Sequence, residues 1–349
     1  MTFRRAVAGL IPLDHRAAAD ATALHDRLAK PRGALGRLEE VGVRLAAIAG
    51  ACPPPVPEPA VVAVFAGDHG VLVEGVTPWL QEVTAQMVAA FCAGGAAVNV
   101  LARHAGAQVV VVDVGVASDL PPAPGLLLRK VRHGTANLAA GPAMTVEEAA
   151  RALDVGAAVA AGAAADGARC LVTGDMGIGN TTASAALIAA FTGRAAEEVT
   201  GRGTGVDDPT WRRKIRVVEA AVARAPDTGP LDILAALGGL EIAALAGFIV
   251  GGAAARVPVV VDGVVALAGL LVAAALAPAC VGHCLAGHRS TEPGATAVLG
   301  HLGLEPLLDL GMRLGEGTGA CLALPLVQAA AKVLREMATL DSAGVTGKD

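Results

Sequence analysis

The sequence predicts an α/β protein whose parallel β-sheet is buried on both faces by helices. Two observations indicate this class: short runs of β-branched residues alternate with longer helical segments, and these runs are apolar throughout. Continuous apolar strands are typical of parallel sheets that are covered on both sides. Ligands bind such sheets at the carboxyl ends of the strands, so functional residues are expected there.

The N-terminal segment, residues 14–50, is expected to be helical, with a break at residues 30–33. Its apolar residues recur every three or four positions, as on one face of a helix: Leu35, Leu38, Val41, Leu45 and Ile48. Residues 52–59 contain five prolines and are expected to be a linker.

Strands and helices then alternate along the chain. Strands are expected over residues 60–66, 108–112, 126–131 and 257–261 and in the apolar run that begins at Cys170. Helices are expected over residues 78–90, 183–188, 209–224 and 231–255, and again after residue 263. A further helix, ending near residue 165, is predicted by the capping box of Thr145 and Glu148.

Polar residues lie at the ends of four of the expected strands, each with a glycine within two positions. They are Asp68 with His69, Asp113, Asp175 and Asp262. Because the carboxyl ends of parallel strands meet at one edge of the sheet, these side chains are expected to share one large polar pocket. The alternative for each aspartate is a helix N-cap or a turn former.

Three glycine-rich loops stand out, at residues 174–180, 201–205 and 315–319. None has the spacing of a P-loop or of the dinucleotide fingerprint, which disfavours a dehydrogenase. The first loop joins an apolar strand to a predicted helix, so its backbone N–H groups are expected to bind a phosphate or carboxylate. Asn180 and the two threonines after it are expected to cap that helix; a plain tight turn is the alternative.

Glu316 lies between two glycines in the third loop. Small neighbours let the ring of a ligand approach the carboxylate, which would desolvate it and raise its pKa, as a general base requires. The alternative is a solvated loop glutamate. Residues 288–294 form another polar segment, with groups suited to binding an anion or a hydroxyl.

The composition argues against nucleic acid as a partner. The net charge is −5 and only 2% of the 349 residues are aromatic, so the chain has neither a basic footprint nor stacking platforms for bases. The length allows one large domain or two.

The six cysteines are scattered and form no CxxC pair, which indicates reduced thiols in a cytoplasmic protein. Cys280, His283 and Cys284 lie close together, but no fourth ligand has matching spacing, so no metal site is expected. The N-terminus lacks a signal-peptide core. Residues 242–255 and 264–281 are apolar enough to raise a membrane alternative, but they lack flanking basic clusters and are expected to be buried core helices.

Taken together, the motifs resemble one family, the nicotinate-nucleotide:dimethylbenzimidazole phosphoribosyltransferases of the lower-ligand branch of cobalamin biosynthesis. The matching segments follow one another in order at residues 30–39, 66–71, 82–87, 94–99, 177–182, 201–205 and 314–320. Each is a weak signal alone, and the ordered set is specific.

The resemblance implies a reaction. Nicotinate mononucleotide gives its ribosyl phosphate to a ring nitrogen of dimethylbenzimidazole, which yields α-ribazole phosphate and nicotinate. The family places the general base at the glutamate of the third glycine loop, here Glu316, and needs neither a cofactor nor a metal. The alternatives are the same transfer to a different lower-ligand base, a nucleosidase or a type I phosphoribosyltransferase, a non-catalytic nucleotide-binding module and a membrane transporter.

The resemblance also assigns substrate-binding residues. Positions that line the benzimidazole pocket correspond to Gln86, Met176 and Leu314. The phosphate and ribose side corresponds to Gly177, Ile178, Gly179, Asn180, Gly203 and Lys214, and further polar positions to Asp262 and Ser290. Two departures stand out: Asp175, where the family typically has glutamate, leaves the base preference open, and Ala295 stands where the family often has histidine.

For the fold, the resemblance implies a Rossmann-like sheet with a small helical domain built from both ends of the chain. Residues 1–52 are expected to form the N-terminal helices of the small domain, and residues 60–320 the catalytic domain. Residues 321–340 are expected to return to the small domain as a helix, and residues 341–349 to be a disordered tail. The family forms homodimers, so a homodimer is expected here.

Overall fold

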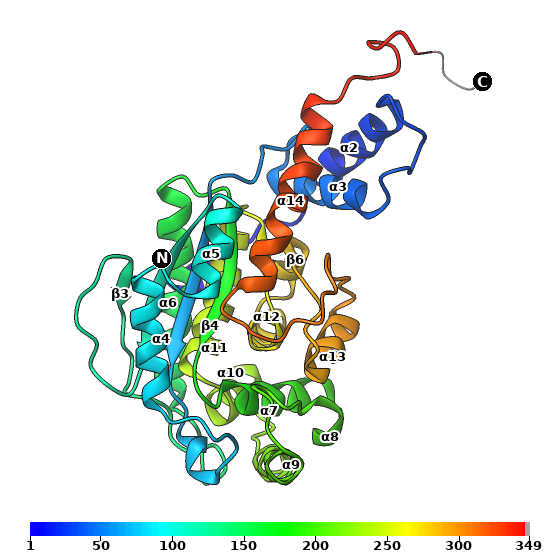
Figure 1. Cartoon of the computed structure of the whole chain (residues 1–349). Coiled ribbons are helices and arrows are strands. Elements are labelled where there is room, and N and C mark those ends of the chain that lie inside the picture. The colour runs from blue at the N-terminus through cyan, green and yellow to red at the C-terminus, as the bar shows by residue number, and fades with distance from the viewer. Residues whose placement is uncertain (346–349) are drawn as a thin grey trace.

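The computed structural model, which describes residues 1–345, has a six-stranded parallel sheet at its centre (Figure 1). The strands lie in the order β3-β2-β1-β4-β5-β6. Their bounds are β1 Ala60–Gly67, β2 Ala107–Gly115, β3 Leu126–Leu128, β4 Cys170–Met176, β5 Val259–Val261 and β6 Cys284–Ala286. The predicted parallel α/β fold is confirmed.

The sheet reverses its strand order between β1 and β4, so this pair forms the topological switch point at which such sheets bind ligands. Ala66 of β1 pairs with Asp113 of β2 on one side and with Met176 of β4 on the other. The register therefore brings the polar ends of the central strands to one edge, as the sequence predicts.

Helices surround this sheet, and two short 3-10 helices interrupt the loops. The N-terminal half has α1 Phe3–Ala8, α2 His15–Arg27, α3 Arg37–Ala49, η1 Gly70–Glu74, α4 Glu82–Cys92, α5 Ala97–His104 and α6 Val146–Ala165. The C-terminal half has α7 Asn180–Thr192, α8 Ala196–Val199, α9 Asp208–Val222, α10 Pro230–Leu237, α11 Leu240–Ala254, α12 Val264–Leu276, η2 Pro278–His283, α13 Pro293–Leu302 and α14 Thr318–Glu336.

The side chains of β1 point alternately to the two faces of the sheet, and the core therefore has two layers. Ala63 and Phe65 pack with the helices of one face, which include α6, α11 and α12. Val62 and Val64 point to the other face and pack with residues of α4, α5 and α14. Both faces of the sheet are therefore dry, which explains why its strands are apolar throughout.

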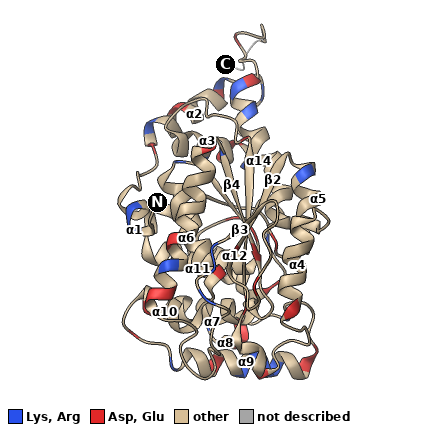
Figure 2. Cartoon of the chain, turned by 90° about the vertical axis from the view of Figure 1, so that its left-hand side faces the viewer, with Lys and Arg blue, Asp and Glu red and all other residues tan. Residues whose placement is uncertain are grey.

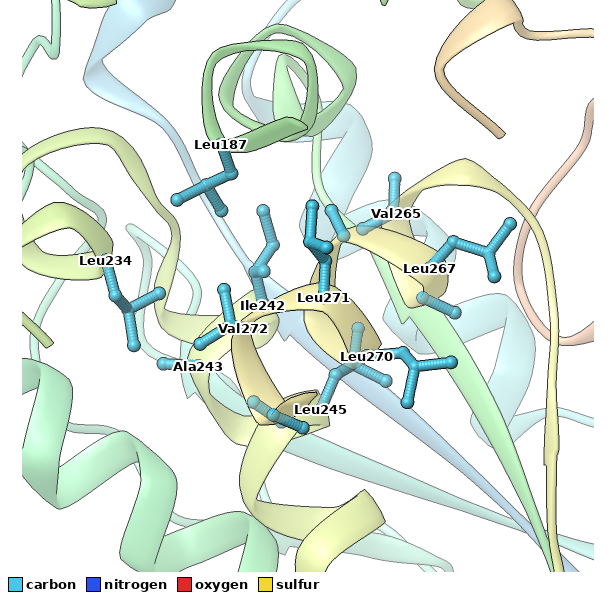
Figure 3. Packing of buried hydrophobic residues seen from close by; sticks show 14 of the residues in the cluster. Leu187, Leu234, Ile242, Ala243, Leu245, Val265, Leu267, Leu270, Leu271 and Val272 are labelled. Carbon is cyan, nitrogen blue, oxygen red and sulfur yellow. The ribbon is translucent and has the colours of Figure 1, made fainter. Parts of the chain in front are cut away.

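The two apolar segments that raise a membrane alternative are α11 and α12, and every residue of α11 from Leu240 to Ala253 is buried. In Figure 3, Leu245 of α11 lies beside Leu270 of α12, and Leu187 of α7 and Leu234 of α10 face the same cluster. The prediction that these segments are core helices is confirmed. Gly156 lets α6 approach α11 closely, because a Cβ there would lie 1.8 Å from the Ala244 carbonyl oxygen.

Residues 82–104 form another stretch that is long and apolar enough to cross a membrane. Along this stretch the chain turns at Gly94, whose φ is +77°, and so divides it into α4 and α5. A third of the most apolar window is buried. Over the outer helices Lys and Arg are interspersed among Asp and Glu, and some charged residues also lie on inner segments of the molecule (Figure 2).

Several element boundaries differ from the predicted ones. The expected helix over residues 231–255 breaks at Gly238, the C-cap of α10, and Gly239, the N-cap of α11. Residue 239 must be a glycine, because a Cβ there would lie 2.4 Å from the Cε1 atom of His69. The helix expected from residue 78 starts at Glu82, and the strand expected over 126–131 stops at Leu128. The helices α5 and α13 and the strand β6 were not predicted.

The N-terminal helices α2 and α3 pack beside the C-terminal half of α14 (Figure 1). Ala21, Ala46 and Leu334 meet there in a small cluster. The C-terminal helix starts at Thr318 rather than at residue 321, so it runs from the third glycine loop to the N-terminal helices. Residues 341–344 of the predicted tail form a turn, and residues 346–349 lie outside the described residues.

Candidate active site

The first glycine turn lies at the carboxyl end of β4, directly against the end of β1. Gly177 contacts the Gly67 carbonyl so closely that a Cβ would lie 2.3 Å from that oxygen. Gly179 is the N-cap of α7 and has a φ of +96°, a conformation that L side chains rarely adopt. Both glycines are therefore required by the geometry of this turn.

A hydrogen-bonded chain holds the turn to α4 and β1. The Ile178 N–H donates to Thr84 Oγ1 at 3.2 Å, and the Thr84 hydroxyl donates to Asp68 Oδ1 at 2.6 Å. The Ala117 N–H donates to Asp68 Oδ2 at 2.8 Å. Burial raises the pKa of the Asp68 carboxyl, and these donors lower it in part. Asp68 is thus a structural anchor of the turn.

The prediction that Asn180 caps α7 is wrong. Asn180 is already inside the helix, and its Nδ2 donates to Asp175 Oδ2 at 2.9 Å. Thr181 Oγ1 accepts a hydrogen bond from Lys214 Nζ at 2.7 Å instead of capping the helix. Tertiary partners outcompete the local cap, so the first turn of α7 has no side-chain cap among residues 1–345.

Asp175, in β4, is buried, and its Oδ1 has no hydrogen-bond partner in the described part of the chain. Burial raises the pKa of the Asp175 carboxyl well above its ordinary value, and the negative charges of Asp262 and Glu241 add to that effect. Asp175 therefore presents a carboxyl group that is easily protonated.

Glu316 is only 6% exposed, so it is not a solvated loop glutamate. Its loop lies directly on β4: a Cβ at Gly174 would lie 2.5 Å from the Glu316 carbonyl oxygen, and one at Gly315 would lie 3.3 Å from the Asp175 carboxylate. The glycines therefore bring the two acidic residues together. Glu316 Oε2 has no hydrogen-bond partner within residues 1–345.

The pKa of the Glu316 carboxyl is raised. Burial is the largest cause, the backbone N–H of Val98 at the start of α5 lowers the pKa, and the charge of Asp262 raises it. These opposing effects produce a carboxylate whose basicity is greater than in water.

Asp262 and Ser290 lie on the loops after β5 and β6, and backbone N–H groups donate hydrogen bonds to both side chains. Asp262 Oδ2 accepts from Gly317 N at 3.1 Å, and its Oδ1 accepts from Ala320 N at 2.9 Å. Ser290 is buried, and its Oγ accepts from Glu292 N at 3.3 Å. The Asp262 carboxylate thus holds the loop that carries Glu316.

The second glycine loop is fixed by two charged side chains. Glu292 Oε1 accepts the Gly203 N–H at 2.8 Å. Lys214 is 2% exposed, and its Nζ donates to Thr181 Oγ1 and, at 3.2 Å, to the Gly201 carbonyl oxygen. Burial lowers the pKa of Lys214 to about 8, and Glu292 opposes that effect. Lys214 therefore links the second loop to the first turn of α7.

The three residues expected to line the benzimidazole pocket differ in how far they are buried. Met176, at the end of β4, is partly buried and packs against the core layer that contains α4. Leu314 is 56% exposed beside Gly315. Gln86 is exposed, about 200° round α4 from the buried Thr84. Met87 lies on the Thr84 side and packs against the same layer as Met176.

Comparison with known proteins agrees with the fold and the loops. The family model described as phosphoribosyltransferase matches residues 10–345. The chain belongs to this family. The chain is 57% identical to the nicotinate-nucleotide–dimethylbenzimidazole phosphoribosyltransferase of Salinispora tropica, with all of both chains covered. It is 56% identical to the protein of that name from Chloroflexus aurantiacus, over 97% of this chain and 96% of the relative.

A solved structure shows the same fold. The crystal structure of CobT from Thermus thermophilus superposes with a TM-score of 0.93 at 53% identity, and covers 95% of this chain and 100% of that one. The family resemblance drawn from the motifs is therefore confirmed, and this member of the family is an enzyme that transfers a pentosyl group.

A buried ion pair between His69 and Glu241, near the first glycine turn, was not predicted from the sequence. His69 Nε2 lies 2.7 Å from Glu241 Oε1, and both side chains are fully buried. Burial lowers the pKa of His69, but the Glu241 carboxylate outweighs that effect, so the pKa of His69 is raised. A lone glutamate at the start of an apolar helix was the available signal for this pair, because a buried charge requires a partner.

Thr84, Glu292 and Arg313 were also missed. Arg313 Nη1 donates to the Gly203 carbonyl oxygen at 2.8 Å, so it joins the second glycine loop to the third. Thr84 and Glu292 lie in segments that the sequence singles out, residues 82–87 and 288–294, and Arg313 lies in none. Only the packing of distant segments reveals the contacts of all three. Within residues 1–345 no group of three or more His, Cys, Asp or Glu side chains is arranged to hold a metal ion.

Proposed function

We propose that this enzyme transfers the ribosyl phosphate of nicotinate mononucleotide to a ring nitrogen of dimethylbenzimidazole, giving α-ribazole phosphate and nicotinate. The observation that carries the proposal is the buried Glu316 carboxylate, with one unpartnered oxygen, beside an open glycine turn. The names of the Salinispora and Chloroflexus relatives support the choice of substrates.

The reaction requires one proton acceptor. The nicotinate nitrogen is positively charged while it is bonded to the ribose, so it leaves as a neutral ring nitrogen without a general acid. The unprotonated ring nitrogen of dimethylbenzimidazole attacks C1′ from the face opposite the leaving group, which converts a β-nucleotide into an α-riboside. The N–H proton of the other ring nitrogen must then leave, and a general base removes it.

We assign Glu316 as this base. Its raised pKa makes it a better proton acceptor than an exposed glutamate, and Oε2 is not used by the protein within residues 1–345. The rest of the catalysis is proximity: two rings held beside each other in the same site react as one unit.

The phosphate and ribose are assigned to the turn formed by Gly177, Ile178, Gly179 and Asn180. The start of α7 has no side-chain cap within residues 1–345, and the positive end of that helix favours an anion. Lys214 lies on the same side through Thr181, and Gly203 follows in the neighbouring loop. With a pKa of about 8, Lys214 is mostly protonated at neutral pH and attracts the phosphate.

We assign the acceptor ring to the part of the site that Met176 and Leu314 border, with Gln86 at its outer edge. The polar residues around the ring are then Asp175, Asp262 and Ser290. Asp175 has one free oxygen close to Gly315. The second candidate function is the same transfer to a different lower-ligand base, and the easily protonated Asp175 favours it, since a neutral carboxyl can donate to an acceptor nitrogen or oxygen.

We also propose that the enzyme is a homodimer in the cytoplasm. All six cysteines are free thiols, as expected for a reducing compartment. Trp79 and Leu80, next to α4, are exposed apolar side chains that a partner subunit would cover. Light scattering coupled to size-exclusion chromatography tests the dimer, and a monomer at micromolar concentration would contradict it.

The function is tested by incubating the purified protein with nicotinate mononucleotide and dimethylbenzimidazole, and measuring both products by chromatography. The Glu316→Gln variant keeps the shape of the side chain and removes the base, so kcat is expected to fall by about 10²- to 10⁴-fold. Full activity in that variant would remove Glu316 from its role. If the wild-type protein is inactive with dimethylbenzimidazole, a panel of other bases decides between the two candidate functions.

A further inference from the structure

Glu316 has an unusual backbone conformation for a residue with a side chain. Its φ is +64°, in the left-handed region, and only one other non-glycine residue among residues 1–345, Arg256, shares that sign. Such a conformation persists only where the surrounding structure enforces it. The question is which groups enforce it at Glu316.

The Asp262 carboxylate holds the chain on the C-terminal side of Glu316. It accepts the N–H of Gly317 and the N–H of Ala320, at 3.1 and 2.9 Å. Both donors belong to the start of α14, and both carboxylate oxygens are used. The Asp262 backbone N–H in turn donates to Thr173 Oγ1 at 3.0 Å, so the carboxylate is fixed to β4.

His288 lies on the other side of Asp262. Its Nε2 is 3.3 Å from Asp262 Oδ1, and the two side chains are 1% and 0% exposed. The imidazole ring is packed so tightly on α14 that a Cβ at Gly319 would lie 2.0 Å from its Cδ2 atom. Burial lowers the pKa of His288, but the Asp262 carboxylate outweighs burial and raises it.

We propose that Asp262 and His288 are a positioning pair for the general base: Asp262 fixes the turn that presents Glu316, and His288 lies at ion-pair distance from Asp262 and offsets its charge. The role of the pair rests on the proposed function, in which Glu316 is the base. Neither residue needs to touch the substrate for this purpose, because the pair acts through the backbone of residues 315–320.

The charges around the two groups determine the expected direction of the effects. Glu316 is faced by Asp175 from β4 and by Asp262 from the loop after β5, and the N–H of Val98 is directed at it from α5. His288 is faced by Asp262 and by Asp309, and next to it along the chain is Arg289, which is paired with Asp309 at 3.3 Å.

The two members of the pair should shift the pKa of Glu316 in opposite directions. The Asp262→Asn change removes a negative charge, which lowers the pKa of Glu316 and moves the acidic limb of the kcat–pH profile to lower pH. The His288→Asn change removes the imidazole whose protonated form offsets Asp262, which raises the pKa of Glu316 and moves that limb to higher pH. Each shift is expected to be about half a pH unit.

Both changes should also lower kcat, because they loosen the turn. The N–H groups of Gly317 and Ala320 donate to different oxygens of Asp262. In the Asp262→Asn variant an NH2 group replaces one of these oxygens, so one N–H group loses its acceptor and kcat should fall by about 10- to 100-fold. His288→Asn leaves the Asp262 contacts in place, so its kcat should fall by about three- to tenfold. The KM for nicotinate mononucleotide should change by less than about twofold in both variants, because the pair is on the side of the base.

The experiment measures kcat, KM and the pH profile of the wild-type enzyme and both variants, with His283→Asn as the matched control. His283 is also a buried histidine, but it lies in η2, and the groups that shift its pKa, which include Arg44 and Arg256, lie outside the site. Unchanged kinetics are expected in the control. The pKa of Glu316 is read separately from the ¹³Cδ signal of labelled glutamate, assigned with Glu316→Gln, and this reading needs no turnover.

Opposite shifts of the Glu316 pKa, with a loss of kcat in both variants, would support the pair. Shifts in the same direction, or none, would overturn it even if the proteins fold and turn over. A large rise in the KM for nicotinate mononucleotide would also overturn it, by making Asp262 a substrate contact. An inactive wild-type enzyme would overturn the proposed function. The ¹³Cδ signal of Glu316 would still show whether the two variants shift its pKa in opposite directions, and so would still test the positioning pair.

Discussion

Two glycine turns in this protein have nearly the same backbone and are used in opposite ways. Gly179 begins α7 with a φ of +96°, and Gly317 begins α14 with a φ of +95°. The first turn follows β4 itself, and the second follows a loop that packs on Gly174 of β4. Each lies at the positive end of a helix.

The difference lies in what occupies the exposed N–H groups. At α14 the Asp262 carboxylate takes two of them, so that helix end is closed by the protein itself. At α7 no side chain among residues 1–345 caps the first turn, and the Ile178 N–H just before the helix donates to Thr84. An uncapped helix start is suited to an anionic ligand, whereas a capped one is suited to holding Glu316 still.

The largest effect is expected from closing the open turn with a charge. The Asn180→Asp change places a carboxylate at the proposed phosphate site and removes the donor to Asp175. The KM for nicotinate mononucleotide should rise by about 100-fold or more, since a like charge near a buried anion costs several kcal/mol. Asn180→Ala is the control, because it removes the donor and adds no charge. Equal KM values in the two variants would contradict an anion site at α7.

The two cap glycines offer a matched pair for stability. Alanine at Gly179 or at Gly317 must adopt the left-handed region, which costs about 1–2 kcal/mol. The loss should be larger at Gly317, where a Cβ would lie 3.0 Å from the Thr173 carbonyl oxygen, than at Gly179, where it would lie 3.2 Å from Leu72 Cδ1. Urea unfolding measures both, and an unchanged free energy of unfolding would show that the turns relax freely.

Thr84 tests how much the open turn depends on its anchor. The Thr84→Val change keeps the shape and removes the hydroxyl that joins Ile178 N to Asp68. Two hydrogen bonds are lost, and the one from Ile178 N, which holds the turn directly, is worth about 1–1.5 kcal/mol, so the KM for nicotinate mononucleotide should rise by about five- to tenfold. Thr84→Ser should restore it. A change in kcat alone would place Thr84 with the base instead of the phosphate.

The smallest effect is a pH dependence of phosphate binding. Lys214 has a pKa of about 8 because it is buried, so its charge is present below that pH and is lost as the pH rises through 8. The KM for nicotinate mononucleotide should therefore rise by a few fold between pH 7 and pH 9. Lys214→Met should have a higher KM that is flat over this range. The same pH dependence in Lys214→Met would assign it to another group.

Much of this protein was determined by its sequence. The β-branched runs led to the parallel sheet because a strand buried on both faces must be apolar throughout. The capping box of Thr145 predicted the start of α6 because the interaction is local, and the structure has both of its hydrogen bonds. The ordered glycine motifs indicated the family because each one is needed where backbones approach closely, as at Gly177.

Only the tertiary structure decided how the polar ends of the strands divide their roles. Asp68, Asp175 and Asp262 look alike in the sequence, yet Asp68 anchors a turn, Asp262 closes a helix, and Asp175 keeps a free oxygen. Asn180 gives up its local cap for Asp175, and Gln86 lies on an exposed face of α4. These outcomes depend on contacts between segments such as Asp262 and Gly317, which are 55 positions apart. Local pattern cannot encode which of several equivalent carboxylates reaches a given N–H group, because packing alone determines that distance.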